Sequence, residues 1–341
     1  MSKRVIVTGV TGQDGSHMVD YLLANTDYKI YGGVRRLSVK NHVNIEHIND
    51  PRFELFDFDL TDPHTIQHAV AKINPHYFIN FAAQSFVAGS WSFPWQTFTT
   101  DATAVLTILE TLRQNCKYCR FYNAGSSEEF GDVQYEPQDE NHPLRPRSPY
   151  AAGKCAARHI VKVYRESYGL YAVQGWLFNH EGVRRGEEFV TRKITKNVAR
   201  IKNHLDTRLS IEIFKPIKLG NVDAKRDWSD AEDFMSGVWA MLNQDKDPKQ
   251  LQEYVLASGE THTVKEFLEE AFKAAKVDIY DKEGNIDPKF VEVDPKLFRP
   301  AEVTTLTGDP SRAKQELGWE PKSGFVDLVK KMVHNDLKDY D

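Results

Sequence analysis

Tyr150 and Lys154 are the first residues of this sequence whose types and spacing suggest chemistry. They lie four positions apart in the segment Ser148–Lys154, which is predicted to begin a helix. Residues four apart share one face of a helix. Because an ammonium group favours a phenolate over a phenol, we expect Lys154 to lower the pKa of Tyr150 towards the range of a general base. Such pairs are common on helix surfaces, so this pair indicates a catalytic site only in combination with the other motifs of the sequence.

A serine and two carboxylates follow the fifth predicted strand. The segment Asn123–Gly131 contains Ser126, Glu128 and Glu129, and it leaves the strand at the edge where open α/β sheets bind ligands. We predict that the Ser126 hydroxyl holds the substrate oxygen from which Tyr150 takes a proton. Glu128 adds a second group for proton transfer, which a simple dehydrogenase does not need. A solvated loop is the alternative for both carboxylates, and it carries more weight for Glu129.

A glycine-rich segment lies between the first predicted strand and the first predicted helix. A dinucleotide pyrophosphate can rest on the unpaired N–H groups of a helix that begins at such a loop, and the glycines permit a tight turn. A plain strand-to-helix turn is the alternative, but the position inside a strand–helix–strand unit favours a cofactor. The predicted cofactor contacts in this segment are Gly9, Val10, Thr11, Gly12, Gln13 and Asp14.

The choice of cofactor depends on the residues after the second predicted strand. About 20 residues past the loop, an NAD enzyme carries an acidic residue for the ribose hydroxyl, whereas this sequence has Arg35 and Arg36. Two guanidinium groups can bind a 2′-phosphate, so we predict NADP. Asp59, which precedes Leu60 after the third predicted strand, is a candidate for the adenine edge, and a turn aspartate is an equal alternative.

Strands and helices must alternate through the first half of the chain to position these residues. The predicted strands are Val5–Val7, Lys29–Val34, Phe53–Phe56, Tyr77–Phe81, Phe121–Ala124 and Ala172–Phe178. The predicted helices between them are Ser16–Ala24, Thr65–Ile73, Thr99–Arg113 and Pro149–Tyr168. This repetition predicts an α/β fold with a Rossmann-type, doubly wound parallel sheet.

The second half of the chain breaks the alternation and predicts a smaller, mixed α/β lobe. Helical patterns cover Thr191–Ile201, Ala231–Leu242, Val264–Ala275 and Phe325–Asn335, with short strands near Ile211–Phe214 and Tyr254–Leu256. We therefore expect a cofactor-binding lobe at residues 1–178 and a mainly substrate-binding lobe at residues 179–341, with the chain crossing between them.

Bulk properties exclude several classes of function. The 341 residues carry a net charge of −5, which argues against a nucleic-acid surface, and a basic stretch from Arg184 to Arg200 suits a small anionic ligand. The sequence has no apolar run of about 18 residues and no export signal at its start, so we expect no membrane span and a cytoplasmic enzyme. Cys116 and Cys119 form a C-x-x-C without a second pair, so we expect structural cysteines and no metal site.

Taken together, these motifs resemble the GDP-mannose 4,6-dehydratases, a family of extended short-chain dehydrogenase/reductases. The resemblance reaches both lobes. It is carried by Gly9–Gly15, Phe81–Ser85, Ser126–Glu128, Arg147–Lys154, Tyr164–Gly169, Phe178–Glu181, Arg184–Gly186, Phe189–Thr195, Leu219–Trp228 and Phe298–Val303.

The resemblance implies a set of site residues. Catalytic roles fall on Ser126, where the family usually has threonine, and on Glu128, Tyr150 and Lys154. Further NADP contacts fall on Asp59, Leu60, Phe81, Ala82, Ala83, Gln84, Ser85, Tyr150, Lys154, His180 and Arg185. GDP-sugar contacts fall on Ser85, Ser126, Glu128, Asn179, Val190, Lys193, Gly220, Arg226, Arg299 and Glu302. Arg226 and Arg299 suit a diphosphate because a planar guanidinium binds phosphate oxygens in pairs.

The implied reaction converts GDP-D-mannose into GDP-4-dehydro-6-deoxy-D-mannose and water by internal hydride transfer through NADP, as in deoxysugar and GDP-fucose synthesis. The family also implies a homodimer or homotetramer. Phe86 and Gly182–Val183 depart from the family's usual residues, and Trp91, Phe93 and Trp95 form an unusually aromatic segment. A related GDP-heptose is therefore an alternative substrate. A GDP-4-keto-6-deoxysugar reductase or epimerase and a catalytically silent NADP-binding module are the alternative functions.

Overall fold

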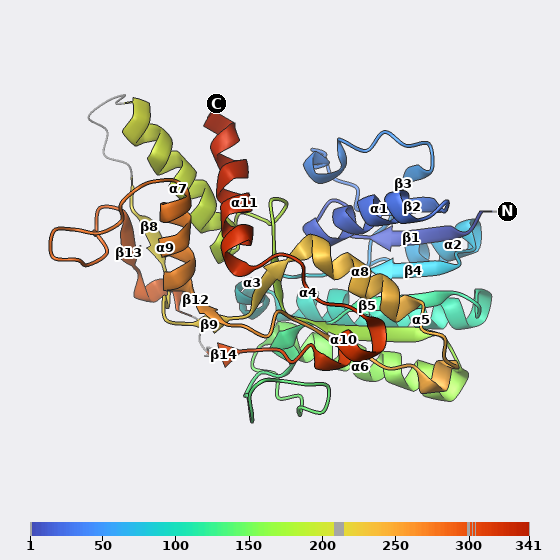
Figure 1. The fold of residues 1–341 in the computed structure, drawn as a ribbon. Helices are drawn as coiled ribbons and strands as arrows, with labels where there is room; N and C mark the ends of the chain where they lie inside the picture. The colour runs from blue at the N-terminus through green and yellow to red at the C-terminus, as the bar shows by residue number, and fades with distance from the viewer. Residues whose placement is uncertain (1, 208–214, 299–300, 302, 304, 341) are drawn as a thin grey trace.

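Short apolar runs form the central sheet of the computed structural model, which describes residues 2–207, 215–298, 301, 303 and 305–340 (Figure 1). Seven strands pair in parallel in the order β11-β6-β5-β4-β1-β2-β3. They are β1 (Arg4–Thr8), β2 (Lys29–Val34), β3 (Phe53–Asp57), β4 (Tyr77–Asn80), β5 (Arg120–Ala124), β6 (Ala172–Leu177) and β11 (Val255–Leu256). The prediction of a doubly wound parallel sheet is confirmed.

Helices cover both faces of this sheet. On one face, α1 (Gln13–Asn25) packs beside α8 (Ala231–Leu242), over a core that includes Val5 and Val7. On the other face, α2 (Pro63–Ile73), α5 (Ala104–Asn115) and α6 (Pro149–Tyr168) pack over a core that includes Ile6. Successive side chains of a strand point to opposite faces, so a continuous apolar run is what a doubly covered strand requires. Cys116 and Cys119 are buried in the second core as free thiols.

The helix α6 begins and ends where its own sequence places it. The Ser148 hydroxyl accepts a hydrogen bond from the N–H of Ala151 at 3.1 Å, and Pro149 occupies the first helical turn. Gly169 closes the helix in the left-handed conformation, with φ of +67°. Serine, proline and glycine are the residues that favour these positions. The predicted bounds Pro149–Tyr168 are therefore those observed.

The helix predicted over Thr99–Arg113 differs from the structure. A five-residue π-helical turn, η2 (Thr99–Thr103), precedes α5. Two short helices, α3 (Val87–Ser92) and α4 (Pro94–Phe98), lead into it. A π-helical turn inserts an extra residue into the helix and rotates the side chains on either side of it, and such turns are frequent at functional sites.

The second half of the chain builds a smaller lobe beside the sheet, and it also returns to the sheet through β11 and α8. The three helices α7 (Val190–Thr207), α9 (Val264–Ala274) and α11 (Phe325–Leu337) pack against one another, at the left of Figure 1. Their buried side chains form one further core. The short helix α10 (Ser311–Leu317) lies against α8.

Among the residues that the structure describes, three small sheets complete this lobe. The strand β7 (Asn179–Glu181) pairs with β10 (Trp228–Asp230), and β8 (Ile217–Leu219) pairs with β13 (Val291–Val293). The strand β9 (Lys225–Arg226) lies between β12 (His262–Thr263) and β14 (Thr305–Leu306). The strand predicted near Ile211–Phe214 falls outside the described residues. No helix in the described part of the chain is long and apolar enough to cross a membrane.

Candidate active site

The glycine-rich turn after β1 lies directly against the segment that follows β4. Gly9 has φ of +71°, and a Cβ atom there would lie 2.8 Å from the backbone nitrogen of Ala82. A Cβ atom on Gly15 would lie 2.3 Å from the carbonyl oxygen of Gly9. Only glycine permits these two approaches. The turn and the Phe81–Ser85 segment therefore form one continuous wall at the carboxyl edge of the sheet.

The start of α1 suits an anionic group. Gly12 is exposed at the N-cap position, and no side chain caps the first turn of this 13-residue helix. The first N–H groups of a helix have no partner within the helix, and the helix dipole favours a negative charge there. The residues present thus fit the pyrophosphate of a dinucleotide cofactor, with Val10 buried beneath the turn and Thr11 half-buried beside it.

Asp14 and His180 form a partly buried pair that joins the first helix to β7. The Oδ2 atom of Asp14 lies 3.0 Å from Nε2 of His180, and Gln13 donates to both Asp14 Oδ1 and the carbonyl oxygen of His180. Burial alone would raise the pKa of Asp14, but His180 brings that pKa well below its usual value. Burial opposes a charge on His180, yet Asp14 raises the pKa of His180. Both residues predicted as cofactor contacts therefore also bind each other.

Arg35 and Asp59 leave neighbouring strands at the same edge. Arg35 and Arg36 are exposed directly after β2, and Asp59 and Leu60 follow β3, which pairs with β2. The Oδ1 atom of Asp59 accepts hydrogen bonds from the N–H and the hydroxyl of Thr61 at 2.8 and 2.7 Å. Asp59 is therefore bound in a turn, and the side chains of Arg35 and Arg36 are exposed at the same edge of the sheet.

A row of buried polar side chains, one hydroxyl and three amides, crosses the sheet beneath the site. The sequence patterns did not reveal it. The Thr8 hydroxyl donates to Asn80 at 2.6 Å, Asn80 donates to Asn123 at 2.8 Å, and Asn123 donates to Gln174 at 2.7 Å. These four side chains come from β1, β4, β5 and β6. Buried polar groups are costly unless they are hydrogen-bonded, so a fully paired row fixes the relative positions of its strands.

Ser126, Glu128, Tyr150 and Lys154 gather beyond the end of β5. Ser126 caps a short 3-10 turn, η3 (Ser127–Glu129), where its hydroxyl accepts a hydrogen bond from the N–H of Glu128 at 3.2 Å. Lys154 is buried on α6, and its ammonium donates to the carbonyl oxygen of Ala124 at 2.9 Å. The predicted residues of the two segments therefore come together at one place.

The pKa of Tyr150 does not follow the prediction. Burial raises this pKa above its usual value, and the nearby carboxylate of Asp101 raises it further, while a hydrogen bond with the Ser126 hydroxyl acts in the opposite direction. The Lys154 nitrogen lies 5.7 Å from the centre of the Tyr150 ring. The net shift in the chain by itself is therefore upward, away from the range that we predicted for a general base, because desolvation disfavours the phenolate.

Asp101 is a further buried carboxylate of the site that sequence reasoning missed. It lies on the π-helical turn η2 with 2% of its surface exposed, and its Oδ1 atom accepts a hydrogen bond from the N–H of Gln84 at 2.8 Å. Burial raises the pKa of Asp101 to about 6, and the Lys154 ammonium opposes the rise. The available signal was an acidic residue among threonines at the start of the helix predicted over Thr99–Arg113.

Glu129 is not a solvated loop residue, which was the alternative given more weight for Glu129 than for Glu128. It is completely buried, and its carboxylate forms an ion pair with Arg158 of α6, with 2.5 Å between Oε2 and Nε. The alternative of a solvated loop is also wrong for Glu128, which is 9% exposed. The turn after β5 is drawn into the protein because Arg158 offers a buried positive charge to its second carboxylate.

Arg185 and Phe189 connect the cofactor side of the site to the smaller lobe. Arg185 pairs with Glu181 at 3.0 Å, and its guanidinium lies 3.6 Å from the centre of the Phe189 ring. The Phe189 ring in turn meets Phe86 edge to face at 5.9 Å. Ser85, next to Phe86, is exposed. The segment after β4 therefore faces the beginning of α7 across the site.

The predicted GDP-sugar contacts lie on separate elements of the smaller lobe. Asn179 starts β7 with its side-chain oxygen buried, while Val190 and Lys193 lie half-buried in the first turn of α7. Gly220 follows β8, where a Cβ atom would lie 2.8 Å from the carbonyl oxygen of Leu297. Arg226 lies on β9 with 7% of its surface exposed. The remaining two predicted contacts, Arg299 and Glu302, lie outside the described residues.

Much of the basic stretch is occupied by internal ion pairs. Arg184 pairs with Asp20 at 2.7 Å, and Arg192 pairs with Asp336 at 2.8 Å. Lys196 pairs with Asp339 at 2.5 Å. These pairs join the segment before α7 to α1, and α7 to α11 and the residues that follow it.

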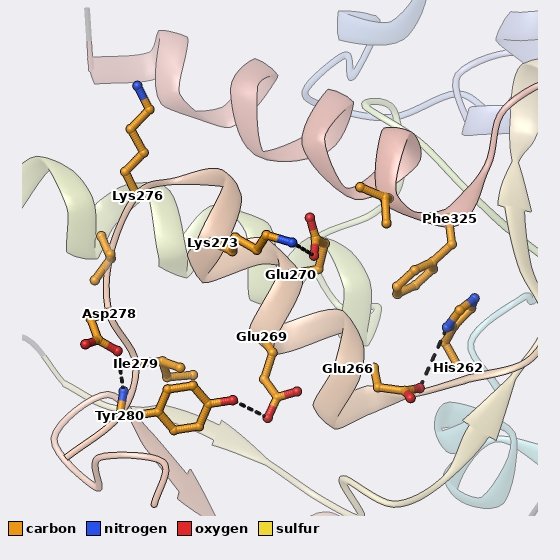
Figure 2. Close-up of a pocket in the computed structure, with 12 residues that line it drawn as sticks. His262, Glu266, Glu269, Glu270, Lys273, Lys276, Asp278, Ile279, Tyr280 and Phe325 are labelled. Atoms are coloured by element: carbon orange, nitrogen blue, oxygen red, sulfur yellow. Dashed lines mark hydrogen bonds and ion pairs between the residues drawn. The ribbon is translucent and has the colours of Figure 1, made fainter. Parts of the chain in front are cut away.

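A surface cavity of about 660 Å³ lies apart from this site, between α9 and the start of α11 (Figure 2). The His262 ring stacks on Phe325 with 3.7 Å between ring centres. Two carboxylates that line the cavity have partners nearby. Glu270 pairs with Lys273 at 3.1 Å, and Glu269 accepts a hydrogen bond from the Tyr280 hydroxyl at 2.8 Å. The cavity contains none of the predicted site residues, and we assign it no role.

The doubly wound sheet, the uncapped helix after a glycine-rich turn and the Tyr150–Lys154 pair on α6 define the class of extended short-chain dehydrogenase/reductases. The family model for GDP-mannose 4,6 dehydratase matches residues 6–332. GDP-mannose 4,6 dehydratase 1 of Arabidopsis thaliana is 44% identical over 98% of this chain and 90% of that protein. The chain belongs to the GDP-mannose 4,6-dehydratase family.

Two further comparisons agree with this assignment. The GDP-mannose 4,6-dehydratase of Vibrio cholerae is 41% identical over 99% of this chain and 95% of that protein. Among solved structures, the UDP-glucose 4-epimerase of Thermus thermophilus, in complex with NAD, matches with a TM-score of 0.81 at 26% identity, and the match covers 98% of both chains.

Proposed function

We propose that this enzyme converts GDP-D-mannose into GDP-4-dehydro-6-deoxy-D-mannose and water. The observation that carries the proposal is the gathering of Ser126, Glu128, Tyr150 and Lys154 beyond β5, beside a helix start that suits a dinucleotide. A reductase or epimerase of this class uses the tyrosine and the lysine, but it has no evident use for the carboxylate at position 128. Glu128 therefore favours a dehydratase.

The proposed roles follow from what each side chain can do. Tyr150 removes the proton from O4 of the sugar, while Ser126 and Lys154 orient the oxygen and the phenol. The glycine-rich turn and the start of α1 would hold a nicotinamide cofactor, which would supply the reversible hydride acceptor that this reaction requires. The resulting 4-ketone makes the C5 proton acidic, and Glu128 removes it. Glu128 then gives that proton to the leaving C6 hydroxyl, and water departs. The proton that Tyr150 took from O4 passes to C5, directly or through solvent, so the sugar loses one water in total.

We further propose that the smaller lobe holds the GDP group. Arg226 and Arg299 bind the diphosphate, and Asn179, Val190, Lys193, Gly220 and Glu302 line the nucleotide and the sugar. Support comes from the buried but unbonded side-chain oxygen of Asn179 and from the half-buried ammonium of Lys193. In this division of labour, residues 1–178 bind the cofactor and residues 179–341 mainly bind the GDP-sugar, with β11 and α8 returning to the first lobe.

NADP is the proposed cofactor, and its 2′-phosphate is the proposed partner of Arg35 and Arg36. Replacing both by alanine is expected to weaken NADP binding about a hundredfold or more, because each of the two lost charge-assisted hydrogen bonds is worth roughly 1.5–3 kcal/mol. Binding of NAD, which lacks this phosphate, should stay unchanged. Titration calorimetry with each cofactor measures both. Arg145→Ala, which removes an exposed arginine paired with Asp132, is the matched control. Equal losses for NADP and NAD would contradict this assignment.

We also propose a cytoplasmic homodimer or homotetramer. The free, buried thiols of Cys116, Cys119 and Cys155 fit a reducing compartment. The exposed aromatic rings of Trp91, Phe93 and Trp95 suit a contact between subunits. Sedimentation velocity at micromolar concentration is expected to show a dimer or a larger species, and a monomer throughout would refute the assembly.

Incubation with GDP-mannose and NADP in deuterated water tests the proposed function. We expect a product lighter by one water, with deuterium at C5 and no net reduced cofactor. Net consumption of NADPH on 4-keto sugars would instead favour the reductase. If GDP-mannose is unchanged while a GDP-heptose loses water, the reaction class stands and the substrate is the heptose.

A further inference from the structure

Glu129 fixes the backbone that carries Ser126 and Glu128. Its Oε1 atom accepts a hydrogen bond from the N–H of Ser126 at 2.9 Å, while the Ser126 hydroxyl accepts one from the N–H of Glu128 at 3.2 Å. The two bonds close a reciprocal capping box around the turn η3. Because Glu129 is completely buried, its carboxylate has no water to exchange with these partners.

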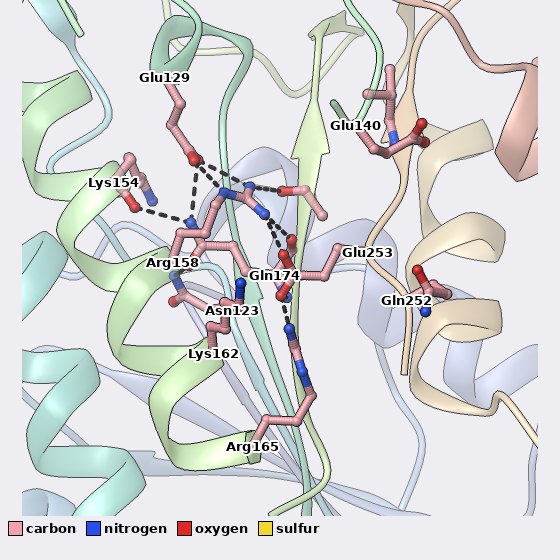
Figure 3. Close-up of polar contacts among 12 residues, drawn as sticks. Asn123, Glu129, Glu140, Lys154, Arg158, Lys162, Arg165, Gln174, Gln252 and Glu253 are labelled. Atoms are coloured by element: carbon pink, nitrogen blue, oxygen red, sulfur yellow. Dashed lines mark hydrogen bonds and ion pairs between the residues drawn. The ribbon is translucent and has the colours of Figure 1, made fainter. Parts of the chain in front are cut away.

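Arg158 holds this carboxylate in place (Figure 3). Its Nε atom lies 2.5 Å from Oε2 of Glu129, and its Nη2 atom lies 3.3 Å from Oε1. The guanidinium is itself fixed, because Nη1 donates to the carbonyl oxygen of Gln174 and to Glu253, both at 2.7 Å. Its plane also stacks on Trp176, 3.5 Å from the ring centre. The arginine therefore has little freedom to move with the turn.

The amide of Gln174 joins Glu129 to the helix that carries Tyr150 and Lys154. Its Nε2 atom donates to Oε1 of Glu129 at 3.2 Å and to the carbonyl oxygen of Lys154 at 3.0 Å. Gln174 also ends the row of buried polar side chains that begins at Thr8 under the glycine-rich turn. One buried network thus reaches the Ser126 turn, the start of α6 and the cofactor side of the sheet.

Stability alone does not account for such a network. Glu129, Arg158, Glu253 and Arg165 are all largely buried, and taking charges out of water costs about as much as their attraction returns. Apolar side chains of similar volume would fill the same space at no such cost. We propose that Glu129 and Arg158 are positioning residues, which hold the Ser126 and Glu128 side chains at fixed positions relative to Tyr150 and Lys154. The proposal rests on the proposed function of those four residues.

The double variant Glu129→Leu, Arg158→Leu tests the positioning role, because it removes the pair without leaving a buried charge from it. We expect a folded protein whose kcat for GDP-mannose falls by about tenfold to a hundredfold, the size of effect that small misplacement of reacting groups causes. KM should change much less than kcat, since the proposed GDP contacts at Asn179, Lys193 and Arg226 are not altered. Glu129→Gln keeps an oxygen for the N–H of Ser126 and should restore most of the lost kcat.

Glu253→Gln is the matched control. It removes a charge from the same network, where Glu253 binds Arg158 and Arg165 at 2.7 Å, but it leaves the bond between Glu129 and Ser126 in place. We expect a lower Tm with kcat retained at a temperature where the protein is folded. A kcat as low as that of the double variant would show a purely structural network and overturn the positioning role.

Hydrogen exchange of the amides of Ser126 and Glu128 gives a readout that needs no substrate. In the wild type we expect exchange as slow as in β5, and in the double variant faster exchange at these amides than elsewhere. Fast exchange in the wild type would overturn the proposal even if the double variant does not fold. A double variant with wild-type kcat and exchange would also overturn it. A wild type that dehydrates no GDP-sugar would refute the proposed function instead, and the exchange result would still decide the positioning.

Discussion

Replacing Tyr150 by phenylalanine is expected to lower kcat about a thousandfold, within the range of roughly 10²–10⁴ that a positioned general base contributes. The ring keeps its volume in a buried site, so the fold and substrate binding should survive. Only the hydroxyl that takes the O4 proton is lost. Steady-state kinetics with GDP-mannose measure the effect.

The pH profile gives this experiment a second readout. A general base must lose its proton before it acts, so wild-type kcat should rise with pH through the pKa of Tyr150 in the assembled site. This limb should be absent from the residual activity of Tyr150→Phe. Burial raises the pKa of Tyr150 in the chain by itself, so a limb at lower pH would show that ligand binding favours the phenolate.

Tyr164→Phe is the matched control for this loss. Tyr164 lies on the same helix, and its hydroxyl is 3.0 Å from Glu110, away from the site. Its kcat should stay close to that of the wild type. If Tyr150→Phe also retained wild-type kcat, Tyr150 would not be the general base. That result would favour the alternative of a catalytically silent NADP-binding module.

Replacing Glu128 by glutamine is expected to lower kcat for dehydration by about 10²–10⁴-fold. The reason is that an amide neither accepts the C5 proton nor delivers it to the leaving hydroxyl. The change preserves shape and removes one charge from a residue that is 9% exposed. Mass spectrometry of the sugar after incubation with GDP-mannose should show no loss of water.

The product ketone separates the roles of the two residues. Incubated with GDP-4-dehydro-6-deoxymannose in deuterated water, the wild type should exchange the C5 proton, because the 4-ketone is already present and only Glu128 is needed. Tyr150→Phe should retain this exchange, whereas Glu128→Gln should lose it. Glu166→Gln, an exposed carboxylate on α6 paired with Lys162, is the control and should behave as the wild type. Exchange by Glu128→Gln at the wild-type rate would assign the C5 proton to another group.

Those parts of the site that depend on near neighbours in the chain could be predicted. The glycine turn before α1 and the bounds of α6 follow from caps, turn residues and helical spacing, which act within a few residues. The spacing of Tyr150 and Lys154 placed them on one face for the same reason. The direction of the net pKa shift of Tyr150 could not be predicted from this spacing, because it depends on how far the phenol is removed from water, and neighbouring residues do not determine that.

The buried face of α6 contained a signal that was not used. Arg158 and Arg165 recur on the face of the helix that also carries Lys154, at positions that spacing assigns to the core. A charged side chain at such a position needs a buried partner of opposite charge. The pattern therefore indicates that acids must approach this face, although it does not say which ones.

By itself, then, the sequence determined the alternation of strands and helices, the residue types of the site and the family to which the chain belongs. Only the tertiary structure decided that Glu129 binds Arg158, 29 positions away, that Glu253 binds the same arginine from 95 positions away, and that Asp101 reaches Gln84. The physical reason is the range of the interactions. Caps and helical periodicity act between neighbours, whereas a buried charge finds its partner only when the packed sheet brings distant segments together.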